Sequence, residues 1–180
     1  IGNMGIAQGM DILIDLADEL RDRTDIGFLF VGRGTEKERL IKLSQKKSLN
    51  NIIFHDEIDS DAIPGLLKTC SIGLIALNLK HKSHNIPGKF LSYIQAGLPV
   101  LARINPDTDL EHLIRGEVLG EVYTGDDVKP FSICAMKLLD SESSLKEMRE
   151  NGKAYFRENY SVSAAAKNII KSLPDKSNNG

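Results

Sequence analysis

The chain has 180 residues, of which 41% are hydrophobic and 27% are charged. This composition is ordinary for a globular protein, and the length suits one domain with a buried core. The formal net charge of −2 at pH 7 provides no overall attraction to nucleic acid, so nucleic acid is not an expected partner. No apolar run approaches the roughly 18 residues that can span a bilayer, so no transmembrane helix is expected.

Apolar runs alternate with amphipathic segments along the chain. Five runs are predicted strands: 26–31, 51–55, 72–77, 100–102 and 119–123. Helical patterns fill the intervals, and further helices are predicted over 128–139, 143–157 and 162–173. The alternation predicts an α/β fold: a doubly wound parallel sheet (Rossmann-like) of about six strands, with helices on both faces and C-terminal helices. The domain is expected to cover 1–173, with a disordered tail over 174–180.

Several short motifs predict where helices begin. Thr35 with Glu38, and Thr108 with Glu111, have the spacing of a capping box. Residues 59–61 offer carboxylate and hydroxyl caps for a helix that continues through Lys68. That helix contains Pro64, which is tolerated only in the first turn of a helix.

The stretch Asn85–Ala102 predicts a loop, a helix, a stop and a strand. Pro87 favours a helix start, Gly88 leaves room for a ligand, and Gly97 ends the helix. Lys89 falls in the first turn, where the helix dipole disfavours a cation. A bound anion would explain that placement, because a helix N-terminus binds phosphate through free N–H groups. An ordinary surface helix is the alternative interpretation.

Five loops are expected at one edge of the sheet. Ligands of doubly wound sheets bind beyond the carboxyl ends of the strands. That rule gathers five loops: 2–9, 32–34, 55–57, 78–89 and 103–111. Every candidate site residue lies in these loops or in the helix that follows Pro87.

The glycine loops leave a second interpretation open. The spacing Gly2-x-x-Gly5-x-x-x-Gly9 is also typical of nicotinamide-binding dehydrogenases. The next strand of such a fold should end in an acidic residue for the ribose, whereas here Arg33 stands at that point. Arg33 could instead accept a 2′-phosphate, so an NADP-binding domain remains an alternative. His81 and His84 have no carboxylate or thiol nearby, and no metal site is predicted.

Three stretches together resemble the C-terminal, donor-binding half of GT-B glycosyltransferases of family 4 (group 1). The resemblance covers essentially all of residues 1–173. It rests on Gly2–Leu13, on Phe28–Gly34 and on Asn85–Ala102, in this order and spacing. Because the chain opens on what looks like the end of a strand, we expect a fragment that lacks an N-terminal acceptor-binding half.

The resemblance implies transfer of a sugar, with retention at the anomeric carbon, from a nucleotide-diphosphate sugar to a glycan or lipid-linked acceptor. No metal or other cofactor is implied, and the fragment alone should be inactive. The protein is expected in the cytoplasm, with contact to the inner membrane face through the missing half. Implied site residues fall into three groups: His84 and Lys89 for catalysis; Gly2, Asn3, Gly5, Gln8, Gly88 and Lys89 for the diphosphate; Gly32, Arg33, Gly34, Asp56, Glu57 and Ser92 for base and ribose.

This sequence departs from the family pattern at four positions. Many members have two glutamates where His84 and Ser92 stand, and an Arg and a Lys where Asn3 and Gln8 stand. Lys89 is the candidate for the missing cation. A glutamine–glycine pair in the first loop and Pro-x-Lys before the helix are similar to a subgroup acting in bacterial surface-polysaccharide synthesis, such as the fucosamine transferases. A GT-B sugar-nucleotide epimerase half and a catalytically inactive sugar-nucleotide-binding domain are further alternatives.

Overall fold

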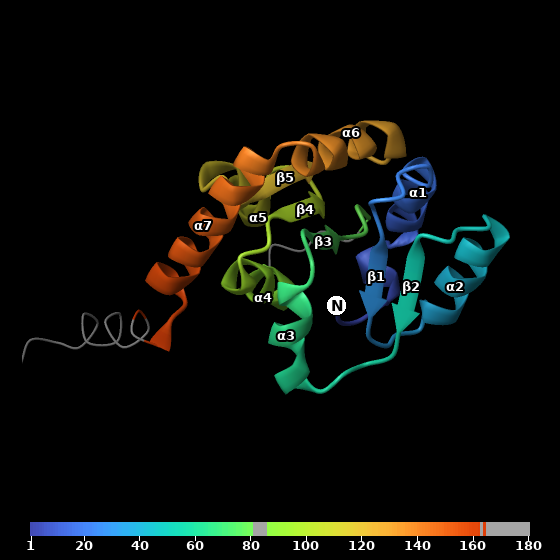
Figure 1. Cartoon of the computed structure of the whole chain (residues 1–180), viewed down its shortest axis with the longest axis horizontal. Helices are drawn as coiled ribbons and strands as arrows, with labels where there is room; N and C mark the ends of the chain where they lie inside the picture. Colours follow the sequence, from blue (N-terminus) through green and yellow to red (C-terminus); the bar gives the residue numbers. More distant parts are fainter. Residues whose placement is uncertain (81–85, 163, 165–180) are drawn as a thin grey trace, which may run out of the picture.

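The computed structural model describes residues 1–80, 86–162 and 164, which form an α/β fold with all-parallel strand pairing (Figure 1). Strands β1 (Phe28–Val31) and β2 (Ile52–His55) pair with each other. Strands β3 (Gly73–Ala76), β4 (Val100–Arg103) and β5 (Gly120–Tyr123) form a second sheet in the order β3-β4-β5.

The predicted parallel α/β fold is confirmed, and the strand count of the described residues is slightly below the expected number of about six. The described residues contain five strands, divided into one two-stranded and one three-stranded sheet. The division falls between β1 and β3, whose facing edges are not hydrogen-bonded to each other.

Helices cover both faces, as predicted. One face carries α1 (Asp11–Glu19), α2 (Lys37–Lys46) and α6 (Val128–Leu139), which contribute to one hydrophobic core. The other core takes residues from α3 (Ile63–Lys68), α4 (Gly88–Ala96) and α5 (Asp109–Gly116), and α7 (Glu142–Asn159) packs on α4. Leu101 of β4 belongs to the first core while its neighbours Val100 and Ala102 belong to the second, because successive strand residues point to opposite faces.

One predicted N-cap forms and the other does not. The Thr108 hydroxyl accepts a hydrogen bond from the Glu111 N–H at 3.3 Å and caps α5. The Thr35 prediction was wrong, because α2 begins at Lys37 after Glu36, with no side-chain cap. The Glu36 N–H instead donates to the Met4 carbonyl at 2.9 Å. A backbone contact with the first loop therefore holds the turn before α2. The spacing of residues near Thr35 could not predict a contact with a distant segment.

The remaining helix boundaries follow the sequence signals closely. A 3₁₀ turn (Ser60–Ala62) precedes α3, and Pro64 lies in the first turn of α3. A second 3₁₀ turn (Ile6–Gln8) lies in the first loop, and Gly97 ends α4 in the left-handed conformation with a φ of 74°. The helix predicted over 162–173 falls almost wholly outside the described residues, as does the tail predicted over 174–180.

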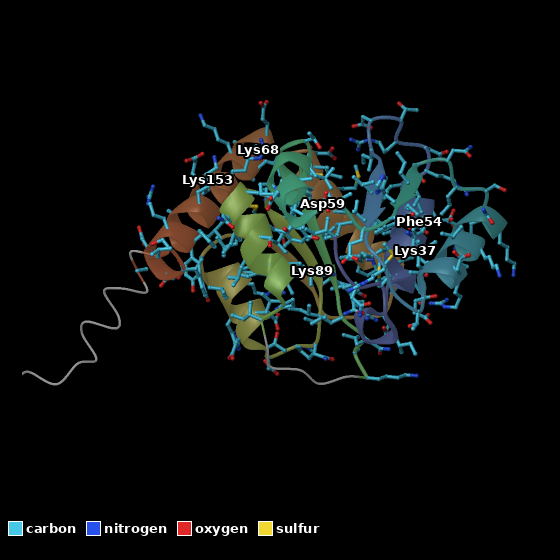
Figure 2. The ribbon with its side chains drawn as sticks, turned by 90° about the horizontal axis from the view of Figure 1, so that it is seen from below. Lys37, Phe54, Asp59, Lys68, Lys89 and Lys153 are labelled. Carbon is cyan, nitrogen blue, oxygen red and sulfur yellow. The ribbon has the colours of Figure 1, made fainter. Side chains whose placement is uncertain are left out.

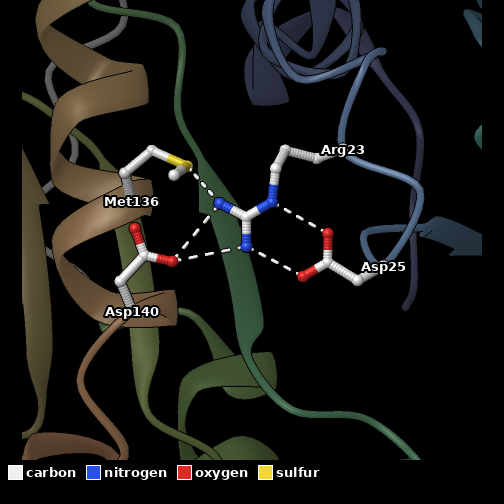
Figure 3. A network of polar contacts seen from close by, with 4 residues as sticks. All are labelled: Arg23, Asp25, Met136 and Asp140. Atoms are coloured by element: carbon white, nitrogen blue, oxygen red, sulfur yellow. Dashed lines mark hydrogen bonds and ion pairs between the residues drawn. The ribbon is translucent and has the colours of Figure 1, made fainter.

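Arg23 links the segment just before β1 to the end of α6 (Figure 3). This contact lies at the end of the strands opposite their carboxyl edge. The Arg23 guanidinium donates two 2.8 Å hydrogen bonds to Asp25, just before β1. The same group donates to Asp140 at 3.3 Å and to the Met136 sulfur at 3.4 Å, both at the end of α6. Since α1 also packs on α6, the β1–β2 pair is held at a fixed position beside the three-stranded sheet.

Candidate functional site

Backbone contacts join the first loop to the turn after β1. The Gly2 N–H donates to the Val31 carbonyl at 2.8 Å, and the Met4 N–H donates to the Arg33 carbonyl at 2.7 Å. Gly32 has a φ of 141°, and a Cβ there would lie 2.0 Å from the Gly2 carbonyl oxygen. This glycine therefore lets two loops of the protein approach each other, and its contact with the base or ribose of a ligand stays a prediction.

Lys37 holds together a second part of the site, the loops that follow β1 and β2, which we call the Lys37 corner. Its Nζ donates to the Gly32 carbonyl at 3.2 Å, to the His55 carbonyl at 3.0 Å and to the Asp56 carboxylate at 2.6 Å. The Lys37 side chain is only 15% exposed, and its hydrogen bond and charge hold the pKa of Asp56 below the usual value. This one ammonium group therefore ties the ends of β1 and β2 together.

The exposed pair of Arg33 and Glu57 lies at the same corner. Their charged groups are 3.3 Å apart and both side chains are mostly exposed. The structure thus brings Arg33, Asp56 and Glu57 of the predicted base and ribose set to one corner, beside Gly32. Ser92 lies on α4, and the described contacts do not join it to this group.

The first loop is also anchored to the end of β3. The Asn78 N–H donates to the Ala7 carbonyl at 2.8 Å, and the Asn78 side-chain amide donates to the Ile6 carbonyl at 3.3 Å. Within the loop, the Gln8 side-chain oxygen accepts from the Gly5 N–H at 3.0 Å. The oxygen of Gln8 therefore shapes the loop, which leaves its side-chain NH₂ group as the part that can donate to a ligand.

The start of α4 faces the first loop. Pro87 is the N-cap residue, in extended conformation, and no side chain caps the helix. Gly88 is exposed, and nothing lies within 4 Å of the position that a Cβ would take there. The first turn of α4 therefore has backbone N–H groups without a side-chain cap beside an open position, an arrangement that suits an anion.

Lys89 lies in that first turn, and its surroundings differ from those of Lys37 (Figure 2). Lys89 takes part in none of the ion pairs formed by the described residues. Burial lowers its pKa, because a charged ammonium loses hydration there. It lines one cavity together with Gly2, Asn3 and Gln8. Three members of the predicted diphosphate set therefore line the same cavity as the predicted cation.

His84 lies outside the described residues, so the structure does not place this predicted catalytic side chain. Among the described residues, no three His, Cys, Asp or Glu side chains gather so that they could hold a metal ion. The described helices also include none that is long and apolar enough to cross a membrane.

Arg103, at the end of β4, is a site-forming residue that sequence reasoning missed. Its buried guanidinium donates to the Leu77 carbonyl at 2.7 Å and to the Gly125 carbonyl at 3.1 Å, and it pairs with Asp126. It thereby holds the ends of β3, β4 and β5 together. The available signal was an arginine directly after the apolar run 100–102, where the end of a buried strand is expected. Since a charged residue is rarely buried without partners, that position predicts hydrogen bonds to neighbouring groups.

Strands wound in parallel, with polar and glycine loops at their carboxyl edge, place the chain in the Rossmann-like class. The chain belongs to the glycosyl transferases group 1 family, whose model matches residues 1–155. The matching solved structures are GT-B glycosyltransferases, so the fold predicted from the resemblance is confirmed.

Three similar proteins illustrate the relationship. WcaI of Escherichia coli K12, described as a colanic acid biosynthesis glycosyl transferase, is 33% identical over 112 residues, or 62% of this chain and 27% of its own. The C-terminal domain of LpcC from Francisella tularensis has a TM-score of 0.75 at 18% identity, over 90% of this chain and 84% of that one. HepE of Anabaena in complex with UDP has a TM-score of 0.73 at 18% identity, and the match covers 96% of this chain and 47% of that one. The chain thus spans about a quarter of the curated relative.

Proposed function

We propose that this chain is the donor-binding half of a retaining glycosyltransferase that takes a sugar from a nucleotide-diphosphate sugar. The acceptor would be a glycan or a lipid-linked glycan in bacterial surface-polysaccharide synthesis, and an N-terminal half would bind it. Membership of the group 1 family supports transferase chemistry. The match to a C-terminal domain of a group 1 protein supports the assignment to that half.

The observation that carries the proposal is the placement of Lys89. Among the described residues it has no ion-pair partner, and none of their side chains caps the helix start at which it lies; it lines a cavity with Gly2, Asn3 and Gln8. Burial already costs this ammonium part of its hydration. A diphosphate would provide the missing opposite charge, and the first-turn N–H groups of α4 would donate to its oxygens.

The corner around Lys37 suits the rest of the nucleotide. Arg33, Asp56 and Glu57 present exposed charged groups there, and a ribose offers hydroxyls that carboxylates can accept hydrogen bonds from. Lys37 would hold this surface in place, and the backbone at Gly32 and Gly34 would contact the base and ribose. Anabaena HepE was crystallised with UDP, so a nucleoside diphosphate of this kind is the first probe to use.

The chemical task of this half is electrostatic. When the bond from the anomeric carbon to the diphosphate breaks, negative charge develops on the departing oxygen. Lys89 and the N-terminus of α4 would stabilise that charge, and no covalent nucleophile is assigned to this half. We propose that no metal is needed for this step, so that full-length enzyme should retain its transfer rate in a chelator.

A thermal-shift panel tests the proposal on the chain itself, with UDP, GDP, UDP-N-acetyl sugars and NADP. A nucleoside diphosphate or its sugar should raise the melting temperature, because a ligand that binds only the folded state stabilises it. Failure of every diphosphate nucleotide would refute the donor-binding assignment. A shift with NADP alone would instead support the dinucleotide-binding alternative.

A second test asks whether the half works in catalysis. The chain alone should transfer no sugar, whereas the full-length protein should transfer sugar from the nucleotide that shifts the melting temperature. Nucleotide binding without turnover by the full-length protein would indicate the inactive sugar-nucleotide-binding domain. Interconversion of the nucleotide sugar itself would indicate the epimerase.

A further inference from the structure

Arg103 is a buried cation at the carboxyl edge of the three-stranded sheet. Its side chain is only 8% exposed, and it stands at the end of β4, which lies between β3 and β5 (Figure 1). Burying a charge is costly unless hydrogen bonds and an opposite charge compensate it. Arg103 pairs with the Asp126 carboxylate, but that side chain is 79% exposed and therefore screened by water. The backbone oxygens around the guanidinium consequently matter for its burial.

Those oxygens come from the segments that follow the two neighbouring strands. The Arg103 Nη1 group donates to the Leu77 carbonyl at 2.7 Å, just after β3, and Nε donates to the Gly125 carbonyl at 3.1 Å, after β5. The Leu77 N–H also donates to the Arg103 carbonyl at 2.9 Å. Leu77 is thus bonded to Arg103 twice, by its N–H through the backbone and by its carbonyl through the side chain.

The peptide bond between Leu77 and Asn78 carries this contact across to the first loop. Its C=O accepts from Arg103, while its N–H, which belongs to Asn78, donates to the Ala7 carbonyl at 2.8 Å. The C=O and N–H of a trans peptide point in opposite directions, so one planar unit is bonded on both sides. A cation at the C=O polarises the peptide and strengthens the hydrogen bond that its N–H donates. The buried arginine therefore acts on the first loop without touching it.

Asn78 makes two further contacts with the same part of the loop. Its side-chain amide donates to the Ile6 carbonyl at 3.3 Å. Gly9 has a φ of 53°, and a Cβ there would lie 3.0 Å from the Asn78 Cα. A glycine at this position accepts the left-handed conformation and leaves room for Asn78. The segment Ile6–Gly9 is thus seated directly on Asn78.

We propose that Arg103 is a positioning residue of the donor site, which acts through the Leu77–Asn78 peptide to hold the segment Ile6–Gly9. That segment contains Gln8, whose NH₂ group is the part of its side chain available to a diphosphate. The inference rests on the proposed donor-binding function. Arg103 itself does not contact the nucleotide, because its guanidinium is buried among the protein oxygens that it bonds to.

The two parts of the donor site should respond differently to a change at Arg103. The Lys37 corner is held by the Lys37 ammonium and by the bonds of Gly2 and Met4 to the turn after β1. Those bonds do not pass through the Leu77–Asn78 peptide. Removal of the guanidinium should therefore weaken contacts with the diphosphate and spare contacts with the base and ribose.

Amide hydrogen exchange tests the hold of Arg103 on the loop. In Arg103→Met, the Asn78 amide should exchange at least about tenfold faster relative to the Leu77 amide. The Leu77 amide is the internal reference, because it donates to the backbone carbonyl of residue 103, which the substitution keeps. Arg115→Met is the matched control, since Arg115 donates to the Val122 carbonyl of β5 at 3.1 Å. It should leave the ratio of the two exchange rates unchanged.

Calorimetric titration with UDP and with uridine tests the effect on the site. Arg103→Met should bind UDP about three- to tenfold more weakly, because a loop that is no longer held must be ordered when the ligand binds. Uridine affinity should stay within about twofold, since the base and ribose contacts are held separately. Arg115→Met should bind both ligands as the unchanged chain does.

Arg103→Lys keeps the test decisive if the methionine variant does not fold. Its ammonium retains the charge beside Asp126, but Nζ ends one bond short of the Nη1 atom that contacts Leu77. The lysine variant should therefore show the same two losses in smaller measure.

Three results would overturn the proposal. The first is an exchange ratio of the Asn78 and Leu77 amides that is the same in the unchanged chain and in every folded Arg103 variant. The second is unchanged UDP affinity in those variants, and the third is an equal loss of UDP and uridine affinity, which would indicate a general structural role. Failure of UDP to bind the unchanged chain is a different outcome: it would refute the donor-binding function and, with it, this role of Arg103.

Discussion

Two lysines on opposite sides of the candidate site have contrasting surroundings. Lys37 has three oxygen partners within 3.2 Å, and its charge joins the ends of two strands. Lys89 lies at an uncapped helix start, has a pKa lowered by burial, and belongs to none of the ion pairs of the described residues. The first cation is committed to structure, whereas the second is available to a ligand. The position of a lysine in a loop or first turn does not distinguish these roles, but its partners do.

The largest expected effect concerns the corner around Lys37. Gly32→Ala should lower the free energy of unfolding by about 3 kcal/mol or more, because the new Cβ would meet the Gly2 carbonyl and the φ of 141° is unfavourable for alanine. Denaturant unfolding measures this change. Gly65→Ala is the matched control, since nothing lies within 4 Å of its Cβ position. Similar stability of the two variants would show that the loops do not pack as described.

Substitution of each lysine by methionine sharpens the contrast directly. Lys37→Met should destabilise the chain by about 1–2 kcal/mol, because the Gly32 and His55 carbonyls lose a charged donor. Lys89→Met should leave the unfolding free energy equal or higher, because it removes a partly buried charge that forms no ion pair with the described residues. Urea denaturation of both variants provides the measurement. Equal destabilisation would mean that Lys89 also serves the fold.

The smallest effect is expected for Arg33→Ala. Its pair with Glu57 is largely exposed, so the unfolding free energy should stay within about 0.5 kcal/mol of the unchanged chain. A nucleotide that contacts this corner should nevertheless bind more weakly to the variant. Calorimetric titration compared with urea denaturation separates the two readouts. A large loss of stability with unchanged nucleotide affinity would make Arg33 a structural residue.

Much of the fold follows from local patterns in the sequence. The apolar runs at β1 and β3, the Thr108 cap and the Gly97 stop were predicted correctly because each depends on neighbours in the chain. The Thr35 cap failed because a backbone contact from Met4 replaced it. The break between the two sheets was likewise not predicted, since pairing of strands is a long-range property that periodicity does not report.

The candidate site was predicted in part for the same reason. A glycine in a loop indicates that a ligand or another segment lies close to the backbone, but only the structure shows that Gly2 lies against Gly32. The buried roles of Lys37 and Arg103 depend on carbonyls from distant strands, and spacing along the chain carries no record of them. The first-turn position of Lys89 was predicted correctly because its signal is local, while its role at a ligand stays a prediction.

Calorimetric titration of the chain and of Lys89→Met with UDP and with uridine tests the central claim most directly. The claim predicts that UDP binds the unchanged chain more tightly than uridine does, and that Lys89→Met weakens UDP binding by about 1–3 kcal/mol, or roughly 5- to 150-fold. Uridine affinity should stay the same in both. Equal UDP affinity of the unchanged chain and Lys89→Met would contradict the role of Lys89 at the diphosphate.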